Sequence, residues 1–376
     1  MKNIKKIKKV SIKLATLPLL MSLCSFKVNN DYDKELVNNI FTSLTYMDEG
    51  FVGSSISSPI KLIDNNDQSC LLFKTYLNNK YTGYFILDNN YELLISHVDS
   101  LDYYQHVEDY YYLTDIFTIS KDRDEISGKN NVKSMNKSES INNNQLEISN
   151  YSSTYYNLPF VNDSVLVTSS SSYGSSMRIQ GVPTYYNSPD EFSVFPGGGC
   201  SPTAAAMFLS FYDRNSPYFY NVFDPDLPLK QEDDNERVKS IIKELGNLMG
   251  TDSSGGTYSI FLATGTANYL ALKGLDNYTV TFYDATLGDF KDIDYLKGYL
   301  SGLISRKNIA MLNIDTKYQP GNEKVETNHT VVLTGYDNYQ YVGPSVRVNY
   351  GWQSYASDYS INIKSIGTIS CFLGRC

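Results

Sequence analysis

The chain has few of the residues that bind metal ions or form disulfide frameworks. Its 376 residues include three histidines, five cysteines and one tryptophan, and no two cysteines form a C-x-x-C pair. Zinc sites need closely spaced Cys and His ligands, and so few cysteines in so long a chain do not make a disulfide framework. We therefore expect no metal and no other cofactor. If the compartment is oxidising, a disulfide between Cys371 and Cys376 is one alternative.

Basic residues are also scarce beyond the N-terminus. The formal net charge is −9, although the first 13 residues carry six lysines and no acidic residue. The rest of the chain is therefore more acidic than the total suggests. Because contact with a phosphate backbone requires a basic surface, this composition excludes nucleic acid as a partner.

Long apolar stretches are missing as well. The N-terminal lysines are followed by an apolar run from Leu14 to about Phe26, which is shorter than the roughly 20 residues of a membrane-spanning helix. This pattern is typical of a signal peptide. Residues 1–28 are therefore predicted to direct the protein to secretion or to the cell surface. The alternatives are a basic tail and an uncleaved N-terminal anchor, which would be the protein's one contact with a membrane.

One cysteine of this region stands where a bacterial lipoprotein accepts its lipid. This residue is Cys24, but Leu23 before it is not the small residue expected at that place. The sequence therefore does not favour a lipid anchor.

Two modules are predicted beyond the signal peptide. Residues 29–120 begin with a helical apolar pattern at Leu36, Val37, Ile40 and Leu44, followed by short strand-like runs separated by turn residues. This order predicts a small α+β module. Residues 121–176 are rich in Lys, Asn, Ser, Asp and Glu, and we expect a flexible polar linker there.

Residues 177–376 form the second module, with helices first and strands last. Apolar spacing predicts a helix after Cys200 and further helices over 232–249, 259–272 and 293–305. Strands are expected over 278–283, 309–314, 330–336, 345–350 and 359–363. Helices and strands that do not alternate favour an α+β fold, with a helical layer and an antiparallel sheet.

Cys200 has the setting of a reactive thiol. It follows the glycines at 197–199 and precedes Ser201, Pro202 and a helical apolar pattern. Ser201 is expected to cap the helix and Pro202 to suit its first turn. A thiol at a helix N-terminus is stabilised as thiolate. The alternative, a cysteine that packs like a small hydrophobe, is less favoured because Gly199 and its neighbours offer no side chains to pack against.

His329 is the one histidine after the linker and opens an apolar strand. A base held on a strand can form an ion pair with a thiolate, although a hydrogen-bonded edge histidine would also fit. Twenty residues later, Asn349 lies on the next predicted strand, where its side-chain oxygen would orient the imidazole. Trp352 would shield that bond from water.

With these residues in view, the chain resembles the papain-like cysteine peptidases related to bacteriocin-leader (double-glycine) peptidases, in the form found in secreted bacterial proteins. The likeness lies in Gly-Cys-Ser-Pro-Thr-Ala at 199–204 and His-Thr-Val-Val-Leu-Thr-Gly-Tyr at 329–336, supported by the blocks at 212–215, 249–251 and 255–257. It implies a papain-like fold, peptide or protein substrates, and a catalytic triad of Cys200, His329 and Asn349.

The resemblance also implies an oxyanion-hole donor before the nucleophile. Many relatives have a glutamine where this chain has Asn187, whose side chain is one methylene shorter. Gln180 is the second candidate. Relatives often have aspartate as the third catalytic residue, whereas Asn349 follows the papain pattern.

Residues 29–120 resemble, more loosely, the pro-regions of streptopain-like peptidases, through the runs at 58–64 and 83–87. The likeness implies that this module restrains the peptidase until the linker is cut. The alternative is an accessory domain that binds substrate or the cell wall. For the whole chain, the alternative to a peptidase is a degenerate peptidase fold whose Tyr-rich surface binds an extracellular partner.

Overall fold

The protein is described from a computed structural model, which covers most of both predicted modules. The described residues are 32–64, 69–98, 111–113, 119–120, 159–187, 193–195, 199–219, 221–253, 255–276, 278–284, 292–314, 329–351 and 359–373. The predicted signal peptide, Cys24, the linker up to residue 158, Trp352 and Cys376 lie outside them. Cys371 lies in a strand, but its side chain is not described.

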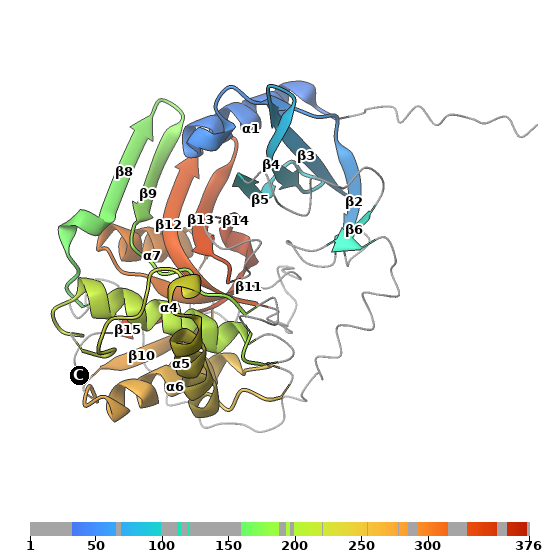
Figure 1. Cartoon of the computed structure of the whole chain (residues 1–376). Helices are drawn as coiled ribbons and strands as arrows, with labels where there is room; N and C mark the ends of the chain where they lie inside the picture. Colours follow the sequence, from blue (N-terminus) through green and yellow to red (C-terminus); the bar gives the residue numbers. More distant parts are fainter. Residues whose placement is uncertain are drawn as a thin grey trace, which may run out of the picture. The chain divides into compact units, whose positions relative to one another are not determined.

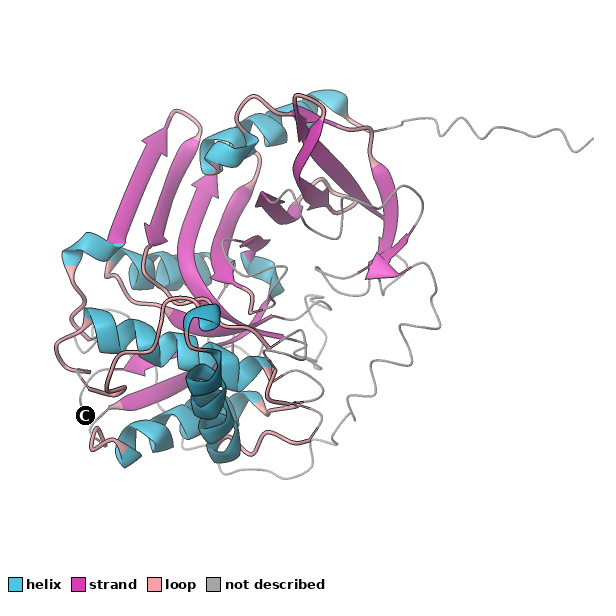
Figure 2. Ribbon diagram, viewed as in Figure 1, coloured by secondary structure: helices cyan, strands magenta, loops and turns pink. Residues whose placement is uncertain are grey.

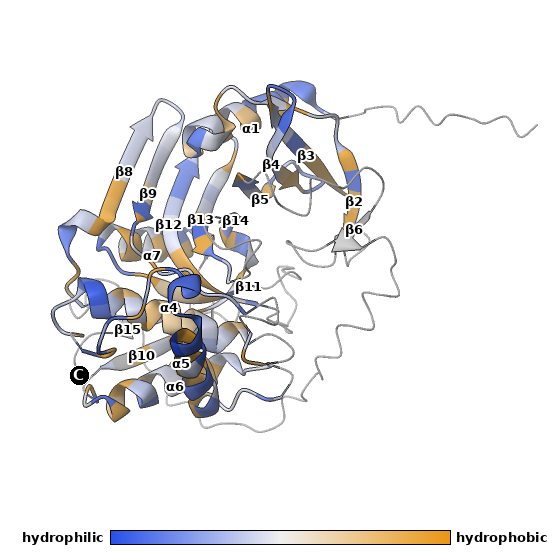
Figure 3. Ribbon diagram, in the orientation of Figure 1, coloured by the Kyte–Doolittle hydropathy of each residue, from blue (hydrophilic) through white to orange (hydrophobic). Residues whose placement is uncertain are grey.

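Five α-helices appear in the described part of the chain (Figures 1 and 2). They are α1 (Lys34–Met47), α4 (Cys200–Asn215), α5 (Asn235–Leu248), α6 (Ser259–Leu272) and α7 (Ile293–Ser305). All five lie where the apolar spacing predicts helices. In α5, apolar residues recur with the period of a helix and polar residues lie between them. Figure 3 accordingly shows both hydrophilic and hydrophobic residues along this helix. None of these helices combines the length and the apolar character needed to cross a membrane.

The strands join in one sheet that runs through both modules. The N-terminal strands are β1 (Ser55–Ile56), β2 (Ile60–Asp64), β3 (Ser69–Leu77), β4 (Lys80–Leu87), β5 (Leu93–Val98), β6 (Tyr111–Leu113) and β7 (Ile119–Ser120). The later ones are β8 (Leu166–Ser171), β9 (Gly174–Ile179), β10 (Thr279–Asp284), β11 (Ala310–Ile314), β12 (His329–Tyr339), β13 (Gly343–Asn349), β14 (Tyr359–Asn362) and β15 (Ile366–Leu373). The order is β10-β15-β11-β12-β13-β14-β5-β4-β3-β2-β6-β7. Among these strands, pairing is antiparallel except between β2 and β6.

Helices and sheet are layered as an α+β fold. The helix α4 packs against α5 and α6 on one side and against β11 and β12 of the sheet, while α7 packs against β9 and β12. The separate helical layer and antiparallel sheet predicted from the sequence are confirmed. The strand β15 was not predicted, although it lies between β10 and β11.

The helix α4 is more deeply enclosed than its sequence suggests. Its pattern predicts one apolar face, but every residue from Ser201 to Asp213 is buried. The reason is that α4 lies between other helices and the sheet, so no face of its first three turns meets solvent. Three consecutive alanines, Ala204 to Ala206, allow this close approach because their side chains are small.

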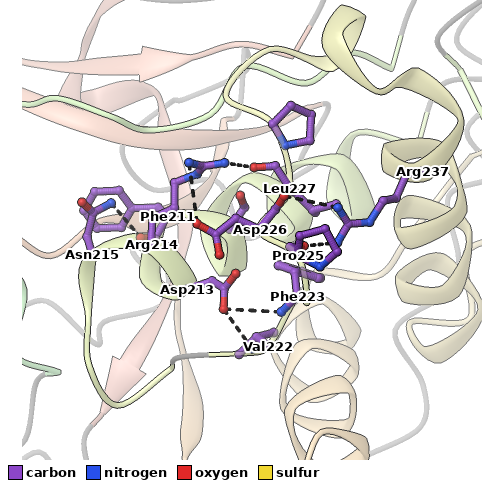
Figure 4. Close-up of polar contacts among 12 residues, drawn as sticks. Phe211, Asp213, Arg214, Asn215, Val222, Phe223, Pro225, Asp226, Leu227 and Arg237 are labelled. Carbon is purple, nitrogen blue, oxygen red and sulfur yellow. Dashed lines mark hydrogen bonds and ion pairs between the residues drawn. The ribbon is translucent and has the colours of Figure 1, made fainter.

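The loop after α4 is held by side chains of two helices (Figure 4). Asp213 and Arg214 from the end of α4, and Arg237 from α5, reach into the loop of residues 216–230. Their hydrogen-bond partners there are main-chain groups of Val222, Phe223, Pro225, Asp226 and Leu227. Arg214 also forms an ion pair with the Asp226 carboxylate at 3.8 Å. Asp213 accepts from the Val222 N–H at 2.9 Å. Two residues of the resemblance block at 212–215 thus hold a loop in place.

The segment predicted as a flexible linker ends in an ordered hairpin. Strands β8 and β9 pair with each other, and β9 also pairs with β12, where Arg178 lies opposite Gly335. The expectation of a linker up to residue 176 is therefore wrong at its C-terminal end. The serine-rich sequence is tolerated because β8 lies at the edge of the sheet and most of its side chains are exposed.

Candidate active site

The nucleophile candidate stands at the first residue of α4. Gly199 is the N-cap and has a left-handed backbone with φ of 101°, which glycine adopts without strain. A side chain at this position would also meet the Phe195 ring at 2.6 Å. The glycine thus lets the chain turn tightly into the helix and leaves Cys200 half-buried at the helix N-terminus.

Ser201 does not cap the helix, contrary to the sequence-based expectation. It lies inside the first turn, is buried, and its Oγ is 2.8 Å from Oγ1 of Thr330. No side chain caps this helix end. The Gly199 carbonyl accepts from both the N–H and the Oγ1 of Thr203, so the first turn is closed while its first N–H groups stay available. Ser201, which directly follows Cys200, is therefore bonded to Thr330, which directly follows His329.

The base candidate, His329, is the first residue of β12. It lies opposite Ile314 of β11. Its Nε2 is 2.7 Å from the main-chain oxygen of Tyr350, and the two rings are 4.2 Å apart. A carbonyl oxygen only accepts, so Nε2 carries a proton. In the neutral ring Nδ1 is then the acceptor, which suits removal of a proton from a thiol.

Cys200 and His329 are brought together, although they are 129 residues apart in the sequence. Burial raises the pKa of the Cys200 thiol. The hydrogen bond and charge of His329, together with the Thr330 N–H, lower the pKa by more than burial raises it, and the result is a pKa of about 7. A substantial fraction of the thiol is therefore ionised at neutral pH. This is the electrostatic setting of a reactive cysteine.

A buried chain of polar side chains lies behind this pair. Ser201 bonds to Thr330, the Thr330 hydroxyl donates to Asn313 Oδ1 at 2.6 Å, and Asn313 Nδ2 donates to Thr368 Oγ1 at 2.6 Å. All four side chains are buried. Because fully bonded buried networks resist rearrangement, this chain fixes α4 relative to β11, β12 and β15.

Asn349 lies at the end of β13, opposite Val332 rather than His329. Its Nδ2 donates to the Pro183 carbonyl at 3.1 Å, and its side chain is buried. In this structure the acceptor at His329 Nε2 is the Tyr350 main chain, so the expected contact of Asn349 with the imidazole is replaced by one with Pro183. Its catalytic role stays a prediction.

The two oxyanion-hole candidates lie in different settings. Asn187 is buried, and its N–H donates to the Gly351 carbonyl at 2.7 Å, directly after Tyr350. A side chain on Gly351 would meet Thr203 of α4 at 3.9 Å. Asn187 is thus bonded to the segment of Tyr350 and Gly351. This segment accepts the hydrogen bond of His329 and lies against α4. Gln180 follows β9 and is exposed, with its N–H bonded to Val165.

Sequence reasoning missed three residues of this site. Tyr350 acts through its main-chain oxygen, which has no sequence signature. Thr330 belongs to the histidine block and Asn313 to a predicted strand, but neither position by itself indicates a role in the site. The available signal was polarity, since Asn313 is an amide in an otherwise apolar buried strand. Among the described residues, no group of three or more His, Cys, Asp or Glu could hold a metal ion.

Comparison with known proteins bears on the same region. Residues 179–365, just under half of the chain, match the model of the Peptidase_C39 like family. No curated protein and no solved structure is significantly similar to the chain. The matched range contains Cys200, His329 and Asn349. The match supports the resemblance to papain-like cysteine peptidases, a class of enzymes that acts on peptides or proteins.

Proposed function

We propose that this chain, whose residues 179–365 are similar to the Peptidase_C39 like family, hydrolyses peptide bonds with Cys200 as nucleophile and His329 as base. The observation that carries the proposal is the Cys200–His329 pair at the N-terminus of α4, with a thiol pKa of about 7. The thiol can thus lose its proton near neutral pH while it lies beside the imidazole.

The reaction follows from the two side chains. The Cys200 thiolate attacks the carbonyl carbon, a C–S bond forms, and the carbonyl electron pair moves to the oxygen. When that pair returns, the C–N bond breaks and His329 gives its proton to the leaving amine. Water then attacks the thioester while His329 takes its proton. The acid product leaves, and Cys200 regains the thiolate.

Charge on the carbonyl oxygen needs hydrogen-bond donors. The first N–H groups of α4 have no partner within the helix, and they lie beside Cys200 at the positive end of the helix dipole. The buried Asn187 amide is the side-chain candidate for a second donor. Asn349 supports this arrangement by holding the 183–187 segment through Pro183.

The test is a mass-spectrometric profile of a peptide library incubated with the purified protein. We expect new peptide termini that share side-chain preferences around the cleaved bond, and none with Cys200→Ala under the same conditions. Identical profiles for the two proteins would sink the proposal. A protein that cleaves nothing but binds a macromolecular partner would be the degenerate, binding form.

We also propose that the protein is exported. The support is the lysine-rich start followed by a short apolar run. Mass spectrometry of native material is expected to find no peptide from residues 1–20. A full-length product in the cytosol would contradict export.

A further inference from the structure

The N-terminal module (here residues 34–98) is joined to the catalytic part (residues 159–373) by main-chain strand pairing. Ser96 and Ile95 of β5 lie opposite Ser360 and Ile361 of β14. Asn362, at the end of β14, adds a buried side-chain bond from Nδ2 to the Leu93 carbonyl at 3.0 Å. Without the module, β14 would present an unpaired edge.

A buried arginine of the catalytic part binds the end of α1. Arg347 is 1% exposed, and its Nε donates to Asp337 at 2.6 Å within the catalytic part. Its other nitrogens reach the module, at 3.2 Å from the Asp48 carboxylate and 3.1 Å from the Met47 carbonyl. Arg178 of β9 donates to the same Met47 carbonyl. Charged groups this deeply buried need all their partners, so separation of the two parts is costly.

The contact also includes the last turns of α1. The Tyr339 hydroxyl donates to the Tyr46 carbonyl at 3.1 Å, and Ser43 Oγ donates to the Gln340 carbonyl at 2.5 Å. The Tyr46 ring stacks on Tyr173 of the β8–β9 turn with centroids 4.6 Å apart. The interface therefore includes residues from the strands on both sides of β12.

Part of the hydrophobic core is also shared. Buried residues of the module and of the catalytic part belong to one continuous cluster, which includes Leu62, Leu72, Tyr84, Ile86 and Ile95 on the module side. The module also has buried apolar residues outside this cluster, such as Val37 and Ile40 of α1 and Phe85 of β4, so only part of its core is shared with the catalytic part. Separation of the module from the catalytic part would therefore expose apolar surface on both parts, which is unfavourable in water.

A row of rings connects the module to the catalytic histidine. His97 of β5 stacks on Tyr359 at 3.8 Å with an interplanar angle of 8°. The Tyr359 ring is 5.8 Å from that of Tyr350, which is 4.2 Å from the His329 ring. Since the Tyr350 main chain also accepts from His329 Nε2, this row of rings is the physical path by which packing in the module would act on the position of the base.

We propose that the N-terminal module is a permanent half of the active protein, which stays bound after any cleavage between residues 98 and 159 and supports His329 through the ring row. It is not a restraint that leaves once its tether is cut. A releasable restraint needs only a weak contact, because the tether supplies a high local concentration. Strand pairing, a buried arginine and a shared core form a contact that does not depend on the tether. Only the effect on His329 rests on the proposed peptidase function.

The test is to insert a recognition sequence for a site-specific protease between residues 121 and 158 and to cleave the purified full chain. We expect both fragments to elute together in size-exclusion chromatography and peptide hydrolysis to continue at an unchanged rate. Separate elution, or a rise in activity on cleavage, would overturn the proposal. Elution is informative even if the protein proves not to be a peptidase.

A matched pair of substitutions tests the interface in the cleaved protein. Asp48→Asn removes the charge opposite Arg347 but keeps an oxygen for the Gly50 N–H. It should weaken association of the fragments about 10- to 100-fold, as loss of a hydrogen bond to a charged group does. Glu92→Gln makes the same change in the exposed Glu92–Lys364 pair and should weaken it less than about fivefold. Equal effects would contradict the role of the buried arginine.

The ring row is tested in the intact chain. His97→Ala removes the ring behind Tyr359 and should lower kcat and move the pH midpoint of Cys200 alkylation upward, because His329 is less well held. His97→Phe keeps a stacking ring and should restore both towards wild type. If His97→Ala leaves kcat and the alkylation midpoint unchanged, the module does not support the base.

Discussion

Replacing Cys200 by alanine is expected to abolish peptide hydrolysis while the fold stays intact. The thiol is the proposed nucleophile, and removal of the nucleophile of a hydrolase can lower kcat on the order of 10⁶-fold. The side chain is half-buried and the turn into the helix depends on Gly199 and not on the thiol, so stability should change little. Activity on a cleaved peptide and the thermal unfolding midpoint measure the two effects.

Labelling gives the control for this substitution. A thiol-reactive peptidase inhibitor should modify Cys200 in the wild type and leave Cys70, which is buried in β3, unmodified. Cys70→Ala should therefore keep labelling, whereas Cys200→Ala should lose it. If Cys200→Ala unfolds and the wild type takes up no label, Cys200 is a core residue and the proposed function fails.

Removing His329 is expected to cost nearly as much as removing Cys200, because nucleophile and base act as a unit. The substitution also has a pH signature. His329 is the main group that lowers the Cys200 pKa to about 7, and burial of the thiol would remain. In His329→Ala the thiol pKa therefore rises, and less thiolate is present at neutral pH.

The rate of Cys200 alkylation as a function of pH measures this shift. In the wild type the rate should climb as pH rises through about 7, and in His329→Ala the climb should occur at higher pH. Asn349→Ala is the comparison, because its side chain bonds to Pro183, and loss of one such bond should cost about tenfold or less. Small and equal losses from all three substitutions would exclude the triad.

Cys200 and His329 could be chosen from the sequence as candidates for nucleophile and base because their signals are local. A glycine run, a cysteine and a helical apolar pattern are contiguous, and so are His329 and its apolar strand. The spacing of apolar residues likewise placed α4 to α7 and the strands β10 to β14, since burial on one face or on both is encoded within each element.

The orienting contact of the base could not be predicted in the same way. Asn349 has the residue type and chain order of a third catalytic residue, yet the register of β12 and β13 places it opposite Val332. That register depends on pairing between strands and on the irregularity near Gly335. The acceptor for His329 is a main-chain oxygen of Tyr350, and every residue has such an oxygen.

The sequence by itself thus determined the class of fold and pointed to Cys200 and His329 as the candidates for nucleophile and base, because hydrophobic period and residue chemistry are properties of short segments. The tertiary structure decided how they are held: the chain from Ser201 to Thr368, the contact of Asn349 with Pro183 and the union of β5 with β14. These contacts join residues that are far apart in the sequence. Each depends on how several elements pack together, which no short segment encodes.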